Sequence, residues 1–254
     1  MSLHVETLGS GAPLLLIHGW GMHGGVWAEV AQKLAEEFQV HTVDLPGYGA
    51  STALPETDLE SLVQALSARF REPLVVCGWS LGGQVALHWA LREPEKVQRL
   101  ILVTSTPCFA EREDWLFGMA AEVLEQFAAE LEQSHVATLR RFIALQLRGS
   151  QNEREILALL RERLFSRGEP DKAALRAGLM ILRDADLRET LQDIKQPTLV
   201  VGGQRDKLTP PEASYYLAQA MPSARVVEME GAAHAPFLSH PDIFVDHVKS
   251  FLHE

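Results

Sequence analysis

Short apolar segments, each bounded by turn residues, recur along the chain. Their hydrophobicity is continuous rather than alternating, which is typical of strands that are buried on both faces of a parallel sheet. The segments from which we expect strands are 14–17, 40–43, 74–77, 100–103, 198–201 and 225–229.

Between most of these segments, apolar residues recur with a helical period. Pro211 and Pro241 each suit the first turn of a helix, where no intrahelical hydrogen bond is lost. Strands that alternate with helices in this way predict an α/β fold with a doubly wound, mostly parallel sheet. The helices that the spacing predicts are 27–38, 59–70, 81–91, 211–221 and 241–252.

One long interval interrupts this alternation. No segment between 107 and 191 has the pattern of a strand, and helical periodicity dominates, with breaks near Gly149 and Gly168. A structureless connection of that length is uncommon in a compact domain. We therefore expect residues 107–191 to form a helical cap (lid), inserted into a core of residues 1–106 and 192–254.

Composition narrows the class of protein. With 254 residues, 46% of them hydrophobic and 22% charged, the chain suits a globular domain with an insertion. We find no signal-peptide pattern and no apolar run long enough to span a bilayer. The two cysteines, Cys77 and Cys108, lack metal or redox spacing, and Cys77 ends an apolar run. We expect a cytoplasmic protein without a metal, with Cys77 in the core. The net charge of −11 argues against a nucleic-acid partner.

A candidate nucleophile follows the predicted strand at 74–77. Ser80 is the serine of a G-x-S-x-G pattern that begins at Gly78, ends at Gly82 and leads directly into a predicted helix. This pattern between a strand and a helix is typical of a nucleophile elbow. The sharp turn brings neighbouring backbone segments close together, so only glycine avoids a Cβ clash two positions before and after the serine. The alternative is an ordinary glycine-rich junction.

A serine hydroxyl needs a base, and the base needs a third group that orients it. His234 follows the last predicted strand among small residues, and Asp206 follows the strand at 198–201. The order Ser80, Asp206, His234 is the one expected for a serine triad on this fold. His240 is a weaker competitor for the base, and a turn aspartate that caps nearby amides is the alternative for Asp206.

Two backbone amides are needed to stabilise an oxyanion. The residue after the serine, Leu81, supplies one at a helix N-terminus. Trp20, in the glycine-rich loop after the strand at 14–17, is our candidate for the second, with its indole forming part of the pocket wall.

The same loop supports a rival interpretation. Residues 19–24 match G-x-G-x-x-G after a strand, and Asp44 follows twenty residues later, where a ribose-binding carboxylate would lie. This pattern would indicate a dinucleotide-dependent oxidoreductase. That interpretation leaves Ser80, Asp206 and His234 without a role.

Taken together, these motifs resemble one known family over nearly the whole chain. It is the pimeloyl-acyl carrier protein methyl ester esterase family of biotin synthesis (BioH), within the α/β-hydrolase superfamily. The segments that carry the resemblance are 18–21, 44–49, 78–83, 105–109, 141–146 and 232–237.

The resemblance implies an α/β-hydrolase fold with a helical cap and a carboxylesterase that needs no cofactor. Its substrate would be a pimeloyl chain on acyl carrier protein, whose methyl ester is cleaved with release of methanol. Sequence spacing alone leaves open a small-molecule esterase, a lactonase or a hydrolase of carbon–carbon bonds. The residues that the resemblance places around the acyl chain are Trp20, Leu81, Phe142, Ile143, Ala144, Leu145, Gln146 and His234.

The charge distribution bears on the partner. Residues 136–183 contain ten basic and five acidic side chains in an otherwise acidic chain. Acyl carrier proteins are acidic, so complementary charge would steer the encounter, although a solvated helix surface is the alternative. By resemblance, Arg141 and Arg154 face the carrier, and we expect a monomer. Pairs of arginines seven residues apart would share a helix face: 141 and 148, 154 and 161, 176 and 183.

Overall fold

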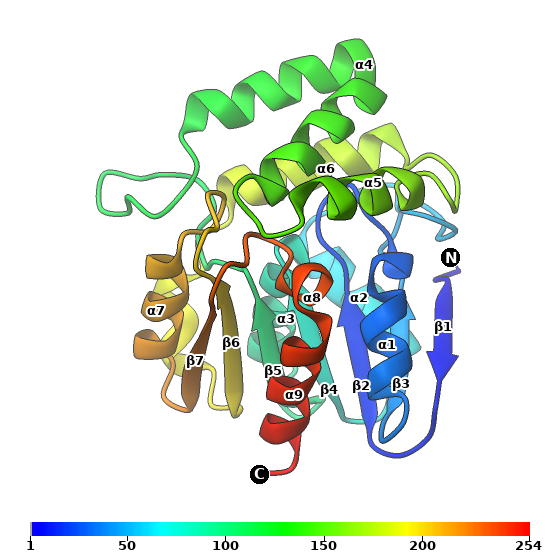
Figure 1. Cartoon of the computed structure of the whole chain (residues 1–254), viewed down its shortest axis with the longest axis vertical. Helices are drawn as coiled ribbons and strands as arrows, with labels where there is room; N and C mark the ends of the chain where they lie inside the picture. Colours follow the sequence, from blue (N-terminus) through cyan, green and yellow to red (C-terminus); the bar gives the residue numbers. More distant parts are fainter. Residues whose placement is uncertain (1) are drawn as a thin grey trace.

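A computed structural model describes residues 2–254 (Figure 1). Its centre is a seven-stranded sheet in the order β1-β3-β2-β4-β5-β6-β7. All six predicted strands are present, which confirms the doubly wound α/β arrangement. The strands are β1 (Val5–Leu8), β2 (Pro13–Ile17), β3 (Gln39–Val43), β4 (Leu74–Trp79), β5 (Val97–Val103), β6 (Thr198–Gly203) and β7 (Ala224–Met229).

The strand β1 is the one that the hydrophobic pattern did not predict. It lies at an edge of the sheet and pairs antiparallel with β3, with Val5 opposite Val43. Three of its four residues are exposed, so it lacks the continuous apolar character of the inner strands. The remaining strand pairs are parallel.

Helices cover both faces of the sheet. In Figure 1, α1 and α9 lie in front of it and contact each other, while α2 and α3 lie behind it and contact each other. Asp58 and Ser61 form a capping box that fixes the start of α2. The helices of the core are α1 (Ala28–Leu34), α2 (Leu59–Arg69), α3 (Leu81–Arg92), α7 (Pro211–Ala220), α8 (Pro236–Ser239) and α9 (Pro241–Leu252).

The predicted helix at 27–38 was too long. A short 3-10 helix, η1 (Gly24–Trp27), precedes α1, and α1 ends at Leu34. The amides of Glu37 and Phe38 both donate to the Leu34 carbonyl, at 3.1 and 3.0 Å, and this turn redirects the chain into β3.

The interval between β5 and β6 is mostly helical, as expected. Its three α-helices lie together above the sheet in Figure 1, beyond the end at which β5 leaves it. Ser134 interrupts α4 with non-helical backbone angles. Gly149 and Gly168, both at positive φ, mark the breaks after α4 and α5. The elements are α4 (Ala121–Leu147), α5 (Glu153–Arg163), α6 (Lys172–Asp184) and the 3-10 helix η2 (Arg188–Asp193).

One side of the cap is tied to the core by buried polar contacts. The Trp20 indole donates to the Leu175 carbonyl at 2.8 Å. The Arg167 guanidinium pairs with the fully buried Asp44 carboxylate at 2.8 Å. Since desolvated contacts of this kind are costly to break, they fix how the cap sits over the sheet. Within residues 2–254, no helix combines the length and the hydrophobicity that crossing a membrane requires.

Candidate active site

Ser80 lies at the junction between β4 and α3 in a strained conformation. Its φ of 55° and ψ of −117° are unusual for a residue other than glycine. Strain of this kind persists only where the surroundings enforce it, and it is characteristic of a nucleophile held at a sharp turn. The Ser80 amide donates to the Val103 carbonyl at 3.1 Å, and Ser105 Oγ donates to the Ser80 carbonyl at 2.9 Å.

The glycines of the elbow have the role that the sequence predicted. A Cβ on Gly78 would lie 2.2 Å from the Gly82 carbonyl oxygen. A Cβ on Gly82 would lie 2.5 Å from the Ile17 carbonyl oxygen. Both neighbours are backbone atoms that cannot move aside, so the close approach of β4, α3 and β2 requires glycine at both positions.

His234 and Asp206 meet at the same edge of the sheet. His234 Nδ1 lies 2.8 Å from Asp206 Oδ2, and both side chains are fully buried. Thr209 Oγ1 donates to Asp206 Oδ2 at 2.7 Å, and the amides of Leu208 and Thr209 donate to Oδ1 at 2.8 and 3.1 Å. The carboxylate is therefore held by four donors, which fixes its orientation toward the imidazole.

The backbone of His234 is held from three directions. Its carbonyl accepts hydrogen bonds from Trp79 Nε1 at 2.7 Å and from Thr104 Oγ1 at 2.6 Å. Its amide donates to the Gln146 carbonyl of α4 at 3.0 Å. The sequence analysis did not identify the supporting roles of Thr104 and Trp79, because these partners are more than a hundred residues from His234.

The reacting atoms of Ser80 and His234 are both buried. Ser80 Oγ and His234 Nε2 have no hydrogen-bond partner within the described residues, so the structure joins His234 to Asp206 but does not hydrogen-bond it to Ser80. In free hydrolases such contacts are often long and tighten only in the substrate complex. Within residues 2–254, no group of three or more His, Cys, Asp or Glu side chains is arranged to hold a metal ion.

The two proposed oxyanion donors flank the nucleophile. Leu81 is the first residue of α3, so its amide is at a helix N-terminus. The loop that carries Trp20 passes close to the serine, because a Cβ on Gly19 would lie 3.2 Å from Ser80 Cβ. Neither the Trp20 nor the Leu81 amide donates a hydrogen bond within the described residues, which leaves both N–H groups for an oxyanion.

The comparisons with known proteins agree with this geometry. Residues 12–241 match the alpha/beta hydrolase fold family. The pimeloyl-acyl-carrier protein methyl ester esterase of Chromobacterium violaceum is 46% identical over 96% of this chain and 96% of its own length. The enzyme of that name from Nitrosomonas europaea is 44% identical over 96% of this chain and 97% of its own. The chain belongs to this esterase family.

Membership makes the chain a hydrolase of carboxylic esters, and solved structures support the fold. An esterase from Exiguobacterium antarcticum superposes with a TM-score of 0.89 at 23% identity, covering 99% of this chain and 96% of the other. At that identity, the likeness shows the α/β-hydrolase fold alone.

The cap segment that the resemblance placed around the acyl chain lies near the proposed nucleophile and base. Phe142 and Ile143 are buried, and Phe142 packs edge-on against Trp20 with ring centroids 4.8 Å apart. Ala144 and Leu145 are half-buried. The amide atoms of the Gln146 side chain are buried without a partner among the described residues. The Trp20 indole thus belongs to the apolar contact between cap and core.

The structure contradicts the dinucleotide interpretation. Asp44 accepts hydrogen bonds from the amides of Gly24 at 2.7 Å and Ala50 at 2.9 Å, and it pairs with Arg167. Burial raises the pKa of Asp44, but the Ala50 and Gly24 amides and the charge of Arg167 outweigh it and leave the pKa below its ordinary value. A carboxylate engaged in this way has no free face for a ribose.

His18 belongs to the same network. Its Nδ1 contacts the Gly19 carbonyl at 2.8 Å, and its Nε2 accepts a hydrogen bond from the Leu45 amide at 2.9 Å. Complete burial lowers the pKa of His18 to about 4. The neutral imidazole therefore links the loop that carries Trp20 to the loop after β3.

The remaining candidates are placed as follows. His240 contacts Ser239 Oγ and Gln151 Oε1, with no contact to the triad side chains. Arg141 is exposed, pairs with Glu130 and stacks over Phe127.

The arginine pairs share helix faces only in part. Arg154 and Arg161 both lie on α5 and are exposed, and Arg176 and Arg183 both lie on α6. The expectation that Arg148 continues the helical face of α4 was wrong, because α4 ends at Leu147 and Arg148 adopts non-helical angles. Cys77 is buried in the core, as expected.

Proposed function

We propose that this chain hydrolyses the methyl ester of a pimeloyl chain carried by acyl carrier protein, as a step in biotin synthesis. The observation that carries the proposal is 40–46% identity, over nearly full length, to proteins named for that activity. The buried pair of His234 and Asp206, beside a strained serine, supports a serine-esterase mechanism for it.

In the proposed acylation step, Ser80 Oγ attacks the ester carbonyl while His234 Nε2 takes the hydroxyl proton. Asp206 holds Nδ1–H and stabilises the imidazolium that forms. The amides of Trp20 and Leu81 stabilise the oxyanion of the tetrahedral intermediate. When the intermediate collapses, His234 returns the proton to the methoxy oxygen, and methanol leaves.

Deacylation repeats these steps with water. His234 takes a proton from a water molecule, which attacks the acyl–Ser80 carbonyl. The second intermediate collapses to the free carboxylic acid, and Ser80 recovers its proton from His234. No step requires a cofactor, because the two proton transfers and the oxyanion contacts are all supplied by the chain.

The carrier is proposed to dock on the cap. Arg141 and Arg154 are both exposed on cap helices, and residues 136–183, which contain both, are the basic segment of an acidic chain. A cationic patch of this kind would attract an acidic carrier by long-range electrostatics. The docked carrier would then deliver its acyl chain between the cap and the core.

The experiment is to compare hydrolysis of methyl pimeloyl-acyl carrier protein with that of free monomethyl pimelate, at low and at high salt. We expect a higher kcat/KM for the conjugate, falling as salt screens the docking charges. Ser80→Ala should lose at least about 10³-fold in kcat on both substrates. Equal, salt-insensitive rates would instead indicate a small-molecule esterase, and a fully active Ser80→Ala variant would contradict the mechanism.

A further inference from the structure

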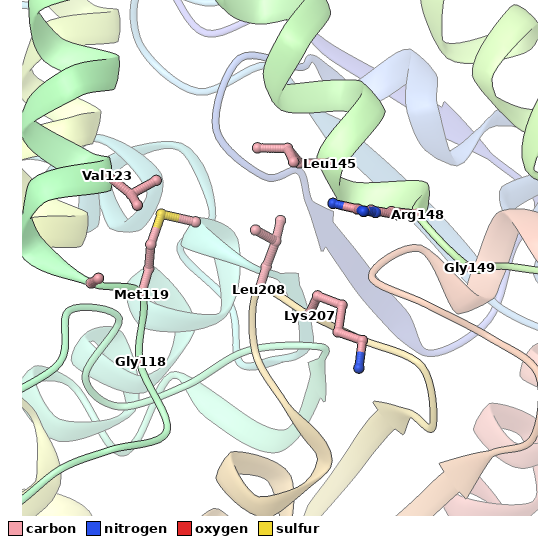
Figure 2. A pocket seen from close by; sticks show the side chains of 9 residues that line it. Gly118, Met119, Val123, Leu145, Arg148, Gly149, Lys207 and Leu208 are labelled. Atoms are coloured by element: carbon pink, nitrogen blue, oxygen red, sulfur yellow. The ribbon is translucent and has the colours of Figure 1, made fainter.

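A pocket of about 640 Å³ lies where the cap meets the loop that follows β6 (Figure 2). In Figure 2, Met119 and Val123 lie on one side of it, Leu145 and Arg148 lie on the other, and the Leu208 side chain points between them. The lining residues are Gly118, Met119, Ala120, Val123, Leu145, Arg148, Gly149, Lys207 and Leu208.

This pocket adjoins the acid and the base of the proposed triad. The amide of Leu208 donates to Asp206 Oδ1 at 2.8 Å. Leu145 is followed by Gln146, whose carbonyl accepts the His234 amide at 3.0 Å. The pocket therefore lies beside the groups that hold Asp206 and His234, which suits it for the distal part of a substrate bound at the reaction centre.

Two cations stand at the edge of this apolar space. Arg148 and Lys207 are exposed, and their side chains make no hydrogen bond or ion pair within residues 2–254. Arg205 adds a third positive charge, since its guanidinium donates to the Gly149 carbonyl at 3.1 Å. The Glu153 carboxylate lies near them, because it accepts a hydrogen bond from the Gly149 amide at 2.9 Å. The three basic side chains outnumber this carboxylate, so their summed charge is positive.

A pocket with apolar walls and a cationic edge suits a ligand that has a long uncharged stretch and then an anion. If the proposed function holds, the methyl ester is at Ser80 and the far end of the pimeloyl chain is an uncharged thioester. The first anionic group beyond it is the phosphate of the phosphopantetheine arm. We propose that Arg148 and Lys207 bind this phosphate and thereby select arm-borne substrates over free esters.

Two ligands that differ only in the phosphate test this assignment. They are the methyl pimeloyl thioesters of 4′-phosphopantetheine and of pantetheine, titrated by calorimetry into Ser80→Ala enzyme so that no turnover occurs. Adding Arg148→Gln and Lys207→Gln should weaken binding of the phosphorylated thioester about tenfold or more, since charged hydrogen bonds are lost. Binding of the pantetheine thioester should change less than about twofold, because its contacts with the apolar walls remain.

Arg71→Gln is the matched control. Arg71 is an exposed arginine that precedes the first residue of β4, whereas Ser80 follows the last residue of that strand. Arg71 is therefore far from the reaction centre, and its substitution should affect the binding of neither ligand. Equal weakening of both thioesters, or no weakening of either, would overturn the assignment. Failure of the proposed function would show separately, as absent hydrolysis of carrier-borne ester by the enzyme with Ser80 intact.

Discussion

The charged and polar groups of the core and of the cap surface are held in opposite ways. In the core, the side chains of His234 and Asp206 are fully buried and bonded to each other. On the cap, Arg176 and Glu132 form an ion pair although their side chains are 58% and 55% exposed. Buried pairs hold one geometry at a high cost of disruption, whereas exposed pairs contribute about 1 kcal/mol or less.

This difference teaches where chemistry and recognition can reside. A proton transfer needs fixed positions, which the buried loops at the sheet edge supply. A transient partner needs charges that can exchange one neighbour for another, as exposed pairs can. Substitutions in the core loops should therefore lower kcat, and substitutions on the cap surface should change KM or leave kinetics unaltered.

The largest effect should come from Asp206→Asn. An amide in place of the carboxylate would favour the wrong imidazole tautomer and leave the imidazolium without its counter-charge. We expect kcat to fall by about 10³- to 10⁴-fold with little change in KM, measured on the methyl ester substrate. Asp193→Asn, an exposed change of the same kind in η2, should have no effect. A fall of less than about tenfold for Asp206→Asn would mean that the buried network does not carry the chemistry.

The network around Asp206 also shows what sequence patterns can predict. Ser80, Asp206 and His234 were identifiable as candidates because each follows a recognisable strand, and the elbow needs glycine at fixed spacing. The inner strands were identifiable because burial on both faces gives continuous apolar runs. The exposed edge strand β1 lacks that signal.

The contacts that hold the side chains of the site in place could not be predicted from sequence patterns. Thr104 and Trp79 bond to the His234 carbonyl across 130 and 155 residues, and Arg167 meets Asp44 across 123. Such pairs arise from the packing of separate elements, and no local periodicity encodes them. For the same reason, the pocket beside Leu208 could not be predicted from the sequence, because residues of both the cap and the core line it.

A smaller effect should follow from Arg167→Gln, which breaks the buried link between the two regions. The variant leaves the Asp44 carboxylate with its amide donors but without its cation, and we expect the free energy of unfolding to fall by about 2–3 kcal/mol. Urea denaturation measures the change. Arg176→Gln removes the exposed pair with Glu132 and should cost less than about 0.5 kcal/mol. Equal losses in the two variants would remove the distinction between buried and exposed contacts on which the comparison rests.

The smallest effect should come from the cap surface, in the double variant Arg141→Glu and Arg154→Glu. Reversing two exposed charges should raise KM for the carrier conjugate about tenfold at low salt, because the acidic carrier is now repelled. The increase should shrink as salt approaches about 0.5 M, where the Debye length is a few ångströms.

Three controls separate docking from other causes of that change. Kinetics on monomethyl pimelate should be unaltered, because neither side chain contacts the triad, and Arg71→Glu should change neither substrate. Arg141 also pairs with Glu130 and stacks on Phe127, so a melting curve must show that the cap remains folded. If KM for the conjugate stayed at the parent value in a folded double variant, the carrier would have to approach by another face. The exposed charges of the cap would then only keep its surface solvated, and the pocket beside Leu208 would account for recognition of the carrier-borne substrate.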